Sequence, residues 1–155
     1  MTAPVIFLDI DGVLNSQRSC AALGGFPYPL SPQNWHLFDP VAVGLLRRVV
    51  QKTGAVCVLS SSWRGLLDDL EPLASTIGVP IIDKTRSTVG RERRGDQIRD
   101  WLGANPEVAV WAILDDDRDM LDDQKDRFIH VGFRDGLSYQ DHLDLILLLG
   151  GERQS

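Results

Sequence analysis

The chain has 155 residues, of which 43% are hydrophobic and 25% are charged, and its formal net charge is −6. These proportions are typical of soluble globular proteins, and they exclude a disordered chain, collagen and a low-complexity scaffold. The length predicts a single domain over residues 1–155. The negative charge disfavours a protein that coats nucleic acid along its length, because that affinity comes from Lys and Arg neutralising phosphates, but it leaves binding of a strand end open.

No uninterrupted apolar run approaches the roughly 18 residues that span a bilayer, so we expect no membrane association. The first residues carry no basic stretch before their short apolar run, which predicts no secretory signal and a cytoplasmic location by default. Cys20 and Cys57 can form at most one bridge, and Cys57 lies in an apolar, strand-like run. Both are therefore expected to be reduced thiols.

Short β-branched apolar runs alternate along the chain with longer segments of helical periodicity, a pattern that predicts a parallel sheet covered by helices on both faces. The expected fold is a Rossmann-like, three-layer α/β/α domain with a mainly parallel five-stranded sheet. Strands are expected at 5–9, 55–60, 79–82, 109–115 and 128–131. Helices are expected at 40–53, 66–77, 95–102 and 138–149, with a further short one at 120–125.

Two segments fit no regular element. Residues 15–39 are rich in Pro, Gly and Ser and have the length of a flap, and residues 83–94 are rich in Arg. Irregular segments this long inside a compact domain are usually functional.

The first predicted strand ends in two aspartates, Asp9 and Asp11, separated by one apolar residue and followed by Gly12. Because side chains alternate along a strand, both carboxylates point the same way. Like charges this close repel unless a proton or a cation lies between them, so the pair indicates a shifted pKa or a bound metal. The alternative is that these aspartates only form the turn after the strand.

The second strand ends in Ser60 and Ser61, at the carboxyl edge where open α/β sheets place their ligands. Hydroxyls and free backbone N–H groups at that edge can hold a phosphoryl oxygen. The alternative is a helix cap.

The fourth strand ends in a run of aspartates that begins with Asp115 and Asp116. In a parallel sheet these carboxylates reach the same edge as Asp9, and hard oxygen ligands suit Mg²⁺. An exposed acidic turn is the alternative, and it is the favoured interpretation for Asp117 and Asp119.

Cations gather locally in this acidic protein, in the stretch 83–99. They include Lys84 and Arg94, and such a reversal of charge favours an anionic ligand nearby. A cation at the start of the helix predicted at 95–102 can face a bound phosphate.

The order of these motifs resembles the haloacid dehalogenase superfamily of phosphotransferases: an apolar strand with D-x-D-G-V, a strand with Ser, a basic residue before a helix, and a strand with D-D. The resemblance spans about residues 5–116 and extends through GLSYQDHLDLI at 136–146. The strings LSSSWR at 59–64, RRGDQIRDWL at 93–102 and ILDDD at 113–117 are most similar to the compact domains of this superfamily in RNA-repair and phage proteins.

The resemblance implies a mechanism. Asp9 would be the nucleophile that forms an aspartyl-phosphate, and Asp11 would protonate the leaving oxygen and then activate water. Mg²⁺ would be held by Asp9, by the backbone carbonyl of Asp11 and by Asp115 or Asp116.

The phosphate-binding residues implied by the resemblance are Gly12, Ser60 or Ser61, and Arg94 or Lys84. We favour Ser60 because it follows the apolar run directly. We favour Arg94 because it precedes the helix as the superfamily would place its basic residue, whereas Lys84 is the only lysine nearby.

Neither the segment 15–39 nor the stretch between Ser60 and Arg94 has room for the cap domain that encloses small substrates in many members. An open site suits a phosphate on something large, and the arginine-rich segment favours an RNA or DNA end over a phosphoprotein. A partner protein or a dimer could also cover the site. The expected function is a Mg²⁺-dependent phosphohydrolase acting on nucleic-acid ends or nucleotides; the alternatives are a phospho-acceptor module and a catalytically silent binding domain.

The remaining candidates carry weaker signals. His36, His130 and His142 have no metal-ligand spacing and are interpreted as structural or surface residues. The aromatic residues Tyr28, Trp35 and Phe38 are candidates for a base-stacking platform, although packing within 15–39 is the favoured interpretation.

Overall fold

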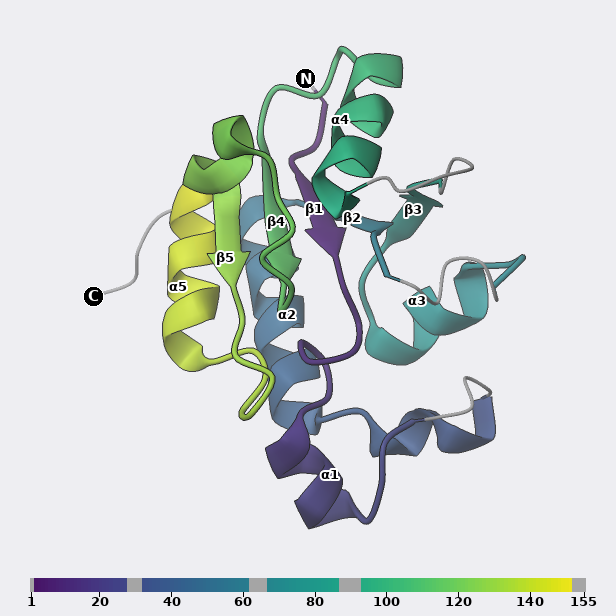
Figure 1. Cartoon of the computed structure of the whole chain (residues 1–155). Helices are drawn as coiled ribbons and strands as arrows, with labels where there is room; N and C mark the ends of the chain where they lie inside the picture. The colour runs from purple at the N-terminus through teal and green to yellow at the C-terminus, as the bar shows by residue number, and fades with distance from the viewer. Residues whose placement is uncertain (1, 28–31, 62–66, 87–92, 152–155) are drawn as a thin grey trace.

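The computed structural model of the chain describes residues 2–27, 32–61, 67–86 and 93–151. Five strands in these ranges form one all-parallel sheet in the order β3-β2-β1-β4-β5 (Figure 1). The strands are β1 (Val5–Leu8), β2 (Val56–Leu59), β3 (Ile81–Lys84), β4 (Trp111–Asp115) and β5 (Phe128–His130). The predicted α/β fold with a five-stranded parallel sheet is confirmed.

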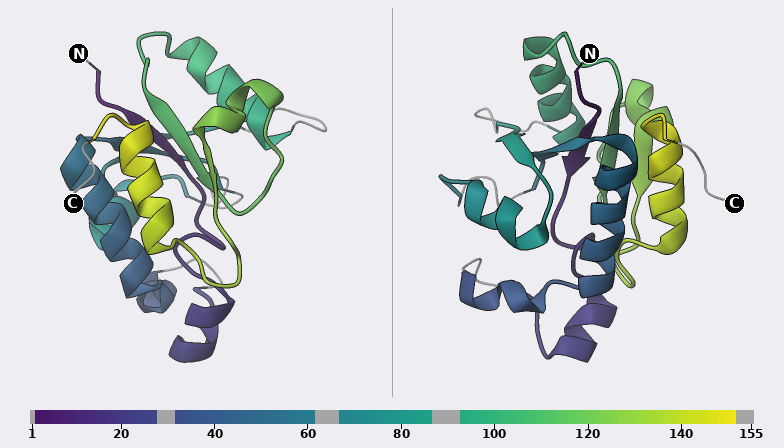
Figure 2. Two further views of the ribbon diagram at one scale, coloured as in Figure 1. Left: turned by 90° about the vertical axis from the view of Figure 1, so that its left-hand side faces the viewer. Right: turned by 180° about the vertical axis from the view of Figure 1, so that it is seen from behind.

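Helices cover both faces of the sheet, as the two sides of β1 require. Ile6 and Leu8 point into the larger core, which also holds residues of α2 (Pro40–Thr53), α3 (Glu71–Ile77) and α5 (Tyr139–Leu148). Val5 and Phe7 point the other way, against Ile98 and Trp101 of α4 (Arg94–Ala104). Figure 2 shows α2 and α5 together on one side of the sheet and α4 on the other. All four of these β1 side chains are buried, which explains the continuous apolar run in the sequence.

The third strand and the helix before it differ from their predicted bounds, and a proline explains each difference. We predicted a helix over 66–77, but α3 begins at Glu71, because Pro72 has no N–H to donate and is tolerated only in the first turn. We predicted a strand over 79–82, but the backbone N–H of Val79 donates to the Ala74 carbonyl of α3 and Pro80 has no N–H. β3 therefore begins at Ile81.

The segment 15–39, for which we predicted no regular element, contains the helix α1 (Gln17–Leu23) and the 3-10 helix η1 (Pro32–Leu37). Ser16 caps α1 by accepting the backbone N–H of Ser19, and Gly24 ends the helix at φ 90°. This Ser pair is a capping signal that is present in the sequence and that our prediction missed. The short helix expected at 120–125 is the 3-10 helix η3 (Asp122–Arg127).

The parallel strands all end at one edge of the sheet, and α1 lies beyond that edge (Figure 1). Within the described ranges, the chain between β1 and α2 forms only α1 and η1, and the chain between β2 and β3 forms only α3, so neither carries a cap domain. None of the described helices is long and apolar enough to cross a membrane. Both cysteines are free thiols, as expected.

Candidate active site

Three carboxylates from the ends of β1 and β4 meet at the carboxyl edge of the sheet. Asp9, Asp115 and Asp116 each place a carboxylate oxygen within 4.8 Å of the other two. β1 and β4 are paired in register, and the Asp9 backbone N–H donates to Leu114 at 3.0 Å, so the two strands end side by side. Asp9 is 5% exposed and Asp115 is fully buried. Of the four aspartates named as candidate metal ligands, these three bring their carboxylates together.

Asp11, the fourth, lines the same cavity but lies outside this cluster. Its Oδ1 accepts a hydrogen bond from Nδ2 of the buried Asn15 at 3.0 Å, and Asn15 Oδ1 accepts the backbone N–H of Gly12 at 3.0 Å. Asn15 therefore fixes both the turn after β1 and the direction of the Asp11 carboxylate. This leaves Asp11 partly exposed and able to meet a ligand, whereas Asp9 is buried.

Gly12 is required at this turn for two reasons. Its φ is +82°, in the left-handed region that side chains disfavour. A Cβ at this position would also overlap the Asp116 carboxylate. The close approach of the β1 turn to Asp116 thus depends on the absence of a side chain.

The two serines at the end of β2 differ in their surroundings. Both are fully buried. The Ser60 hydroxyl has no hydrogen-bond partner among the described residues, whereas Ser61 makes a further interaction within the protein. A buried hydroxyl without a partner is uncommon and indicates a missing ligand atom. Ser60 therefore fits the phosphate-binding position better than Ser61.

Arg94, the first residue of α4, reaches into the carboxylate cluster. Its Nη1 donates to the Ser60 carbonyl oxygen at 2.7 Å and to Asp115 Oδ2 at 2.8 Å, and it lies 3.2 Å from Asp9 Oδ1. Lys84 points elsewhere: its Nζ donates to the Leu67 carbonyl at 2.8 Å, and it borders a separate cavity beside Trp101. Of the two candidate cations, the structure brings Arg94 to the carboxylates and not Lys84.

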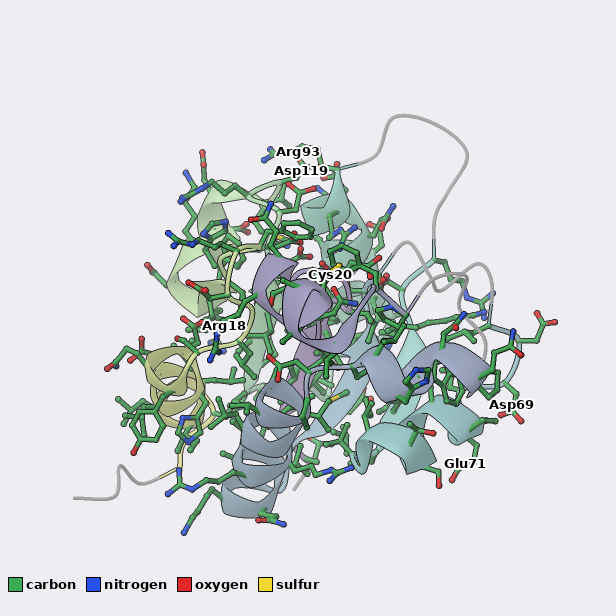
Figure 3. The ribbon with its side chains drawn as sticks, turned by 90° about the horizontal axis from the view of Figure 1, so that it is seen from below. Arg18, Cys20, Asp69, Glu71, Arg93 and Asp119 are labelled. Atoms are coloured by element: carbon green, nitrogen blue, oxygen red, sulfur yellow. The ribbon has the colours of Figure 1, made fainter. Side chains whose placement is uncertain are left out.

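The turn after β4 connects the aspartates to α4 through successive hydrogen bonds. The backbone N–H of Asp117 donates to Asp115 Oδ1, and that of Asp119 donates to Asp117 Oδ1. Asp119 in turn accepts the backbone N–H of Arg94 at 3.2 Å and pairs with Arg93 Nε at 2.9 Å, a contact visible in Figure 3. Since Arg94 donates back to Asp115, these bonds form a closed ring.

Burial and charge shift the acidity of this cluster. Burial, then the neighbouring charge of Asp115, raises the pKa of Asp9 from 3.8 to about 9. Burial also raises the pKa of Asp115, against the opposing effect of Arg94. For Arg94 itself, burial lowers the pKa but the two carboxylates outweigh it, so that its pKa is raised. In the absence of a cation a proton therefore resides on Asp9, while Asp115 is the carboxylate that lies closer to Arg94.

These groups surround an open cavity of about 590 Å³, lined by Asp9, Asp11, Arg94, Asp116, Asp117, Arg118 and His130. Our sequence-based prediction missed the last two. His130 ends β5, and its Nε2 donates to the Asp116 carbonyl at 2.9 Å. The rule that located the aspartates, a polar residue at the end of a parallel strand, also applied to His130, but we judged the histidines only by metal-ligand spacing. Asp117, expected in an exposed turn, is exposed but lines the cavity.

The residues present fit a divalent cation. Three carboxylates supply the hard oxygen ligands that Mg²⁺ prefers. Burial, then the charge of Asp115, raises the pKa of Asp9 although Arg94 opposes them, so a bound cation would favour the ionised form of this carboxyl.

An all-parallel sheet with this order, with carboxylates after β1 and β4, a serine after β2 and a cation opening α4, defines a haloacid dehalogenase-type domain without a cap. The chain belongs to the family described as the HAD domain in Swiss Army Knife RNA repair proteins, whose model matches residues 5–142. No curated protein and no solved structure matches the chain. The family supports a hydrolase of the phosphatase type.

Proposed function

We propose that this protein is a Mg²⁺-dependent phosphomonoesterase that works through an aspartyl-phosphate on Asp9 and acts on the phosphorylated end of a nucleic acid. The observation that carries the proposal is the joint placement of three clustered carboxylates, the Arg94 guanidinium and the buried Ser60 hydroxyl, which has no partner in the described ranges, at one edge of the sheet. Each group answers a separate requirement of phosphoryl transfer.

The Asp9 carboxylate and Asp115 or Asp116, with the Asp11 backbone carbonyl, would hold the cation. A cation bound by these residues would neutralise charge on the phosphoryl oxygens and favour the ionised form of Asp9. Asp9 must be ionised to act as the nucleophile, and burial otherwise keeps the proton on this carboxyl.

In the first step an Asp9 carboxylate oxygen attacks phosphorus, the bond from phosphorus to the ester oxygen breaks, and Asp11 gives its proton to the leaving oxygen. Asp11 suits this task because it lines the open cavity and Asn15 holds its direction. The Ser60 hydroxyl donates to a phosphoryl oxygen. Arg94 contributes positive charge and Nη2, which has no hydrogen-bond partner within the described ranges.

In the second step Asp11, now ionised, takes a proton from water, and the water oxygen attacks the phosphorus of the aspartyl-phosphate. The bond from phosphorus to the Asp9 oxygen breaks, which releases inorganic phosphate and regenerates Asp9. Asp11 thus serves as acid and then as base at one position.

The substrate class rests on the openness of the cavity and on the family's RNA-repair description. With no cap over the cavity in the described ranges, the phosphate of a long strand can reach Asp9 while the rest of the strand stays outside. We propose an RNA or DNA end as the substrate and the chain as one domain. A partner protein or a second copy could then cover the open side.

Phosphate release from oligonucleotides with 3′ or 5′ phosphates, from nucleotides and from p-nitrophenyl phosphate, each with and without Mg²⁺, tests the proposal. We expect Mg²⁺-dependent release from at least one oligonucleotide. Asp9→Asn should abolish it while the circular dichroism spectrum is retained, and the exposed Asp68→Asn serves as the matched control. Failure of the wild-type protein on every ester would contradict the proposal, and a stable phosphoprotein without turnover would favour a phospho-acceptor.

A further inference from the structure

An exposed aromatic ring lies at the rim of the candidate active site. Phe133 follows β5, and 40% of the residue is exposed. The aromatics that the sequence offered as a stacking platform do not fill this role: Trp35 and Phe38 are buried in the core, as packing residues are, and Tyr28 lies outside the described residues. A partly exposed aromatic ring at this position is available to stack on a ligand bound in the site.

Phe133 lies close to the Asp116 carboxylate, because both side chains border Gly12. A Cβ on Gly12 would lie 2.8 Å from Phe133 Cδ2 and would also overlap the Asp116 carboxylate. The ring and the carboxylate therefore border the turn after β1 together, within the reach of a single nucleotide.

The Phe133 ring contacts a second aromatic ring, and hydrogen bonds hold the loop that carries it. Phe26, from the segment before η1, stacks on it with 6.0 Å between ring centroids and 22° between planes. The Phe133 carbonyl accepts the backbone N–H of Gln17 at 3.1 Å, and Leu137 donates to Val13 at 3.0 Å, so the loop is attached to the turn after β1. Figures 1 and 2 show this loop beside the start of α1. Such pre-organisation reduces the entropy that binding must overcome.

The same cavity also has a positively charged side chain, that of Arg118. Arg118 lines it and is exposed, and within the described ranges its guanidinium makes no ion pair or hydrogen bond. Its acidic neighbours are engaged elsewhere: Asp117 accepts the N–H of Asp119, and Asp119 pairs with Arg93. Arg118 is thus available to the phosphate next to the one at Asp9.

We infer that Phe133 stacks on the base of the terminal nucleotide whose phosphate lies at Asp9, which makes it a specificity-determining residue for a single-stranded end. This inference rests on the proposed function. A flat exposed ring suits a base, because every nucleobase has a π face, and stacking tolerates any sequence. A phosphoserine peptide offers no such face, so the aromatic rim favours a nucleic-acid end over a phosphoprotein.

The test compares two oligoribonucleotides that differ only in whether the phosphorylated terminal nucleotide carries its base or is abasic. The quantity measured is the ratio of their KM values, abasic over base-bearing. We expect a ratio of about 10 for the wild-type protein, within the range of measured base–aromatic stacking. Phe133→Leu, which keeps an apolar side chain but removes the flat face, should bring the ratio close to 1. Phe133→Trp, which keeps a flat aromatic face, should keep the wild-type ratio or increase it.

Tyr139→Leu is the matched control, because Tyr139 is an exposed aromatic on α5 that lines none of the described site. It should leave the wild-type ratio unchanged. A wild-type ratio of 1, a Phe133→Leu variant that keeps the ratio, or turnover of a phosphopeptide with no preference between the two oligonucleotides would overturn the inference. Dissociation constants of the same oligonucleotides, from fluorescence anisotropy, give the ratio without turnover. The stacking inference is therefore decided even if the protein releases no phosphate.

Discussion

The Arg94 guanidinium lies 2.8 Å from Asp115 and 3.2 Å from Asp9, so that a single cation bridges the carboxylates that follow β4 and β1. Arg94 is 17% exposed and the two carboxylates are less exposed still. Removal of the Arg94 charge would leave a buried carboxylate without its partner. The loss of folding stability is then far greater than for removal of one partner of a surface ion pair.

Arg94→Met should destabilise the metal-free protein by about 3 kcal/mol at pH 8, because it leaves the buried Asp115 carboxylate without the cation that it pairs with, while the neighbouring Asp9 holds a proton up to a pKa of about 9. The loss should shrink at pH 4, because burial raises the pKa of Asp115 above 3.8 and its carboxyl takes up a proton in this range. Urea unfolding of wild type and variant at both pH values measures this. Arg94→Lys should recover part of the stability, and an equal loss at the two pH values would contradict the explanation.

The two serines after β2 should respond in opposite ways. Ser60→Ala removes a buried hydroxyl that has no partner among the residues that the structure describes, so the free energy of unfolding should be unchanged or slightly higher. Its kcat should nevertheless fall about 100-fold, as for loss of one donor to a reacting oxyanion. Ser61→Ala should lower stability by about 1 kcal/mol, because this residue already interacts within the protein, and should affect kcat far less. The reverse pattern would assign the phosphate-binding position to Ser61.

Mg²⁺ should stabilise the protein more at high pH than at low pH. The folded protein holds a proton on Asp9 up to a pKa of about 9, whereas the unfolded chain loses it near 3.8. This proton's contribution to the stability of the metal-free protein is therefore complete below pH 3.8 and is lost as the pH rises towards 9. A cation must displace the same proton, so the increase in Tm with Mg²⁺ should be small at pH 5.5 and grow towards pH 8.5.

Thermal unfolding at pH 5.5 and pH 8.5, without Mg²⁺ and at concentrations of Mg²⁺ that rise in 10-fold steps, measures this dependence. Asp9→Asn, which cannot ionise at this position, should show a weaker effect of pH. An increase in Tm that is the same at both pH values would contradict a site in which the metal replaces the Asp9 proton.

Asp119 should act on the reaction by placing Arg94. Its carboxylate accepts the backbone N–H of Arg94 and closes the ring that runs through Asp117 and Asp115. Asp119→Ala should lower kcat about 10-fold, because misplacement of a charged group by about 1 Å is expensive in catalysis. Asp119→Asn keeps an acceptor oxygen and should restore most of kcat. If the two variants lose kcat equally, the charge of Asp119 matters and its hydrogen bond to Arg94 does not.

Much of the fold followed from the sequence because its signals were local. The apolar run at the first strand and the helical periodicity of the longer segments placed most elements, and α5 begins within one residue of its predicted start, where Ser138 accepts the backbone N–H of Asp141. The predicted bounds were wrong where a proline outweighed the apolar pattern, and one helix was missed because its capping signal was overlooked. Pro72 and Pro80 shifted α3 and β3, and the Ser16–Ser19 cap of α1 was overlooked.

Some features of the candidate site could likewise be predicted from the sequence, and others could not. That Asp9 and Asp115 would meet could be predicted, because the carboxyl ends of parallel strands lie along one edge whatever the details of packing. The amino-acid order thus determined the class of fold and the set of acids at its edge. Only the tertiary structure decided that Arg94 and not Lys84 reaches them and that His130 and Phe133 border the site. It also decided that the Ser60 hydroxyl has no partner within the described part of the chain. Those outcomes depend on where separate loops direct their side chains, and that direction is set by contacts between residues far apart in the chain.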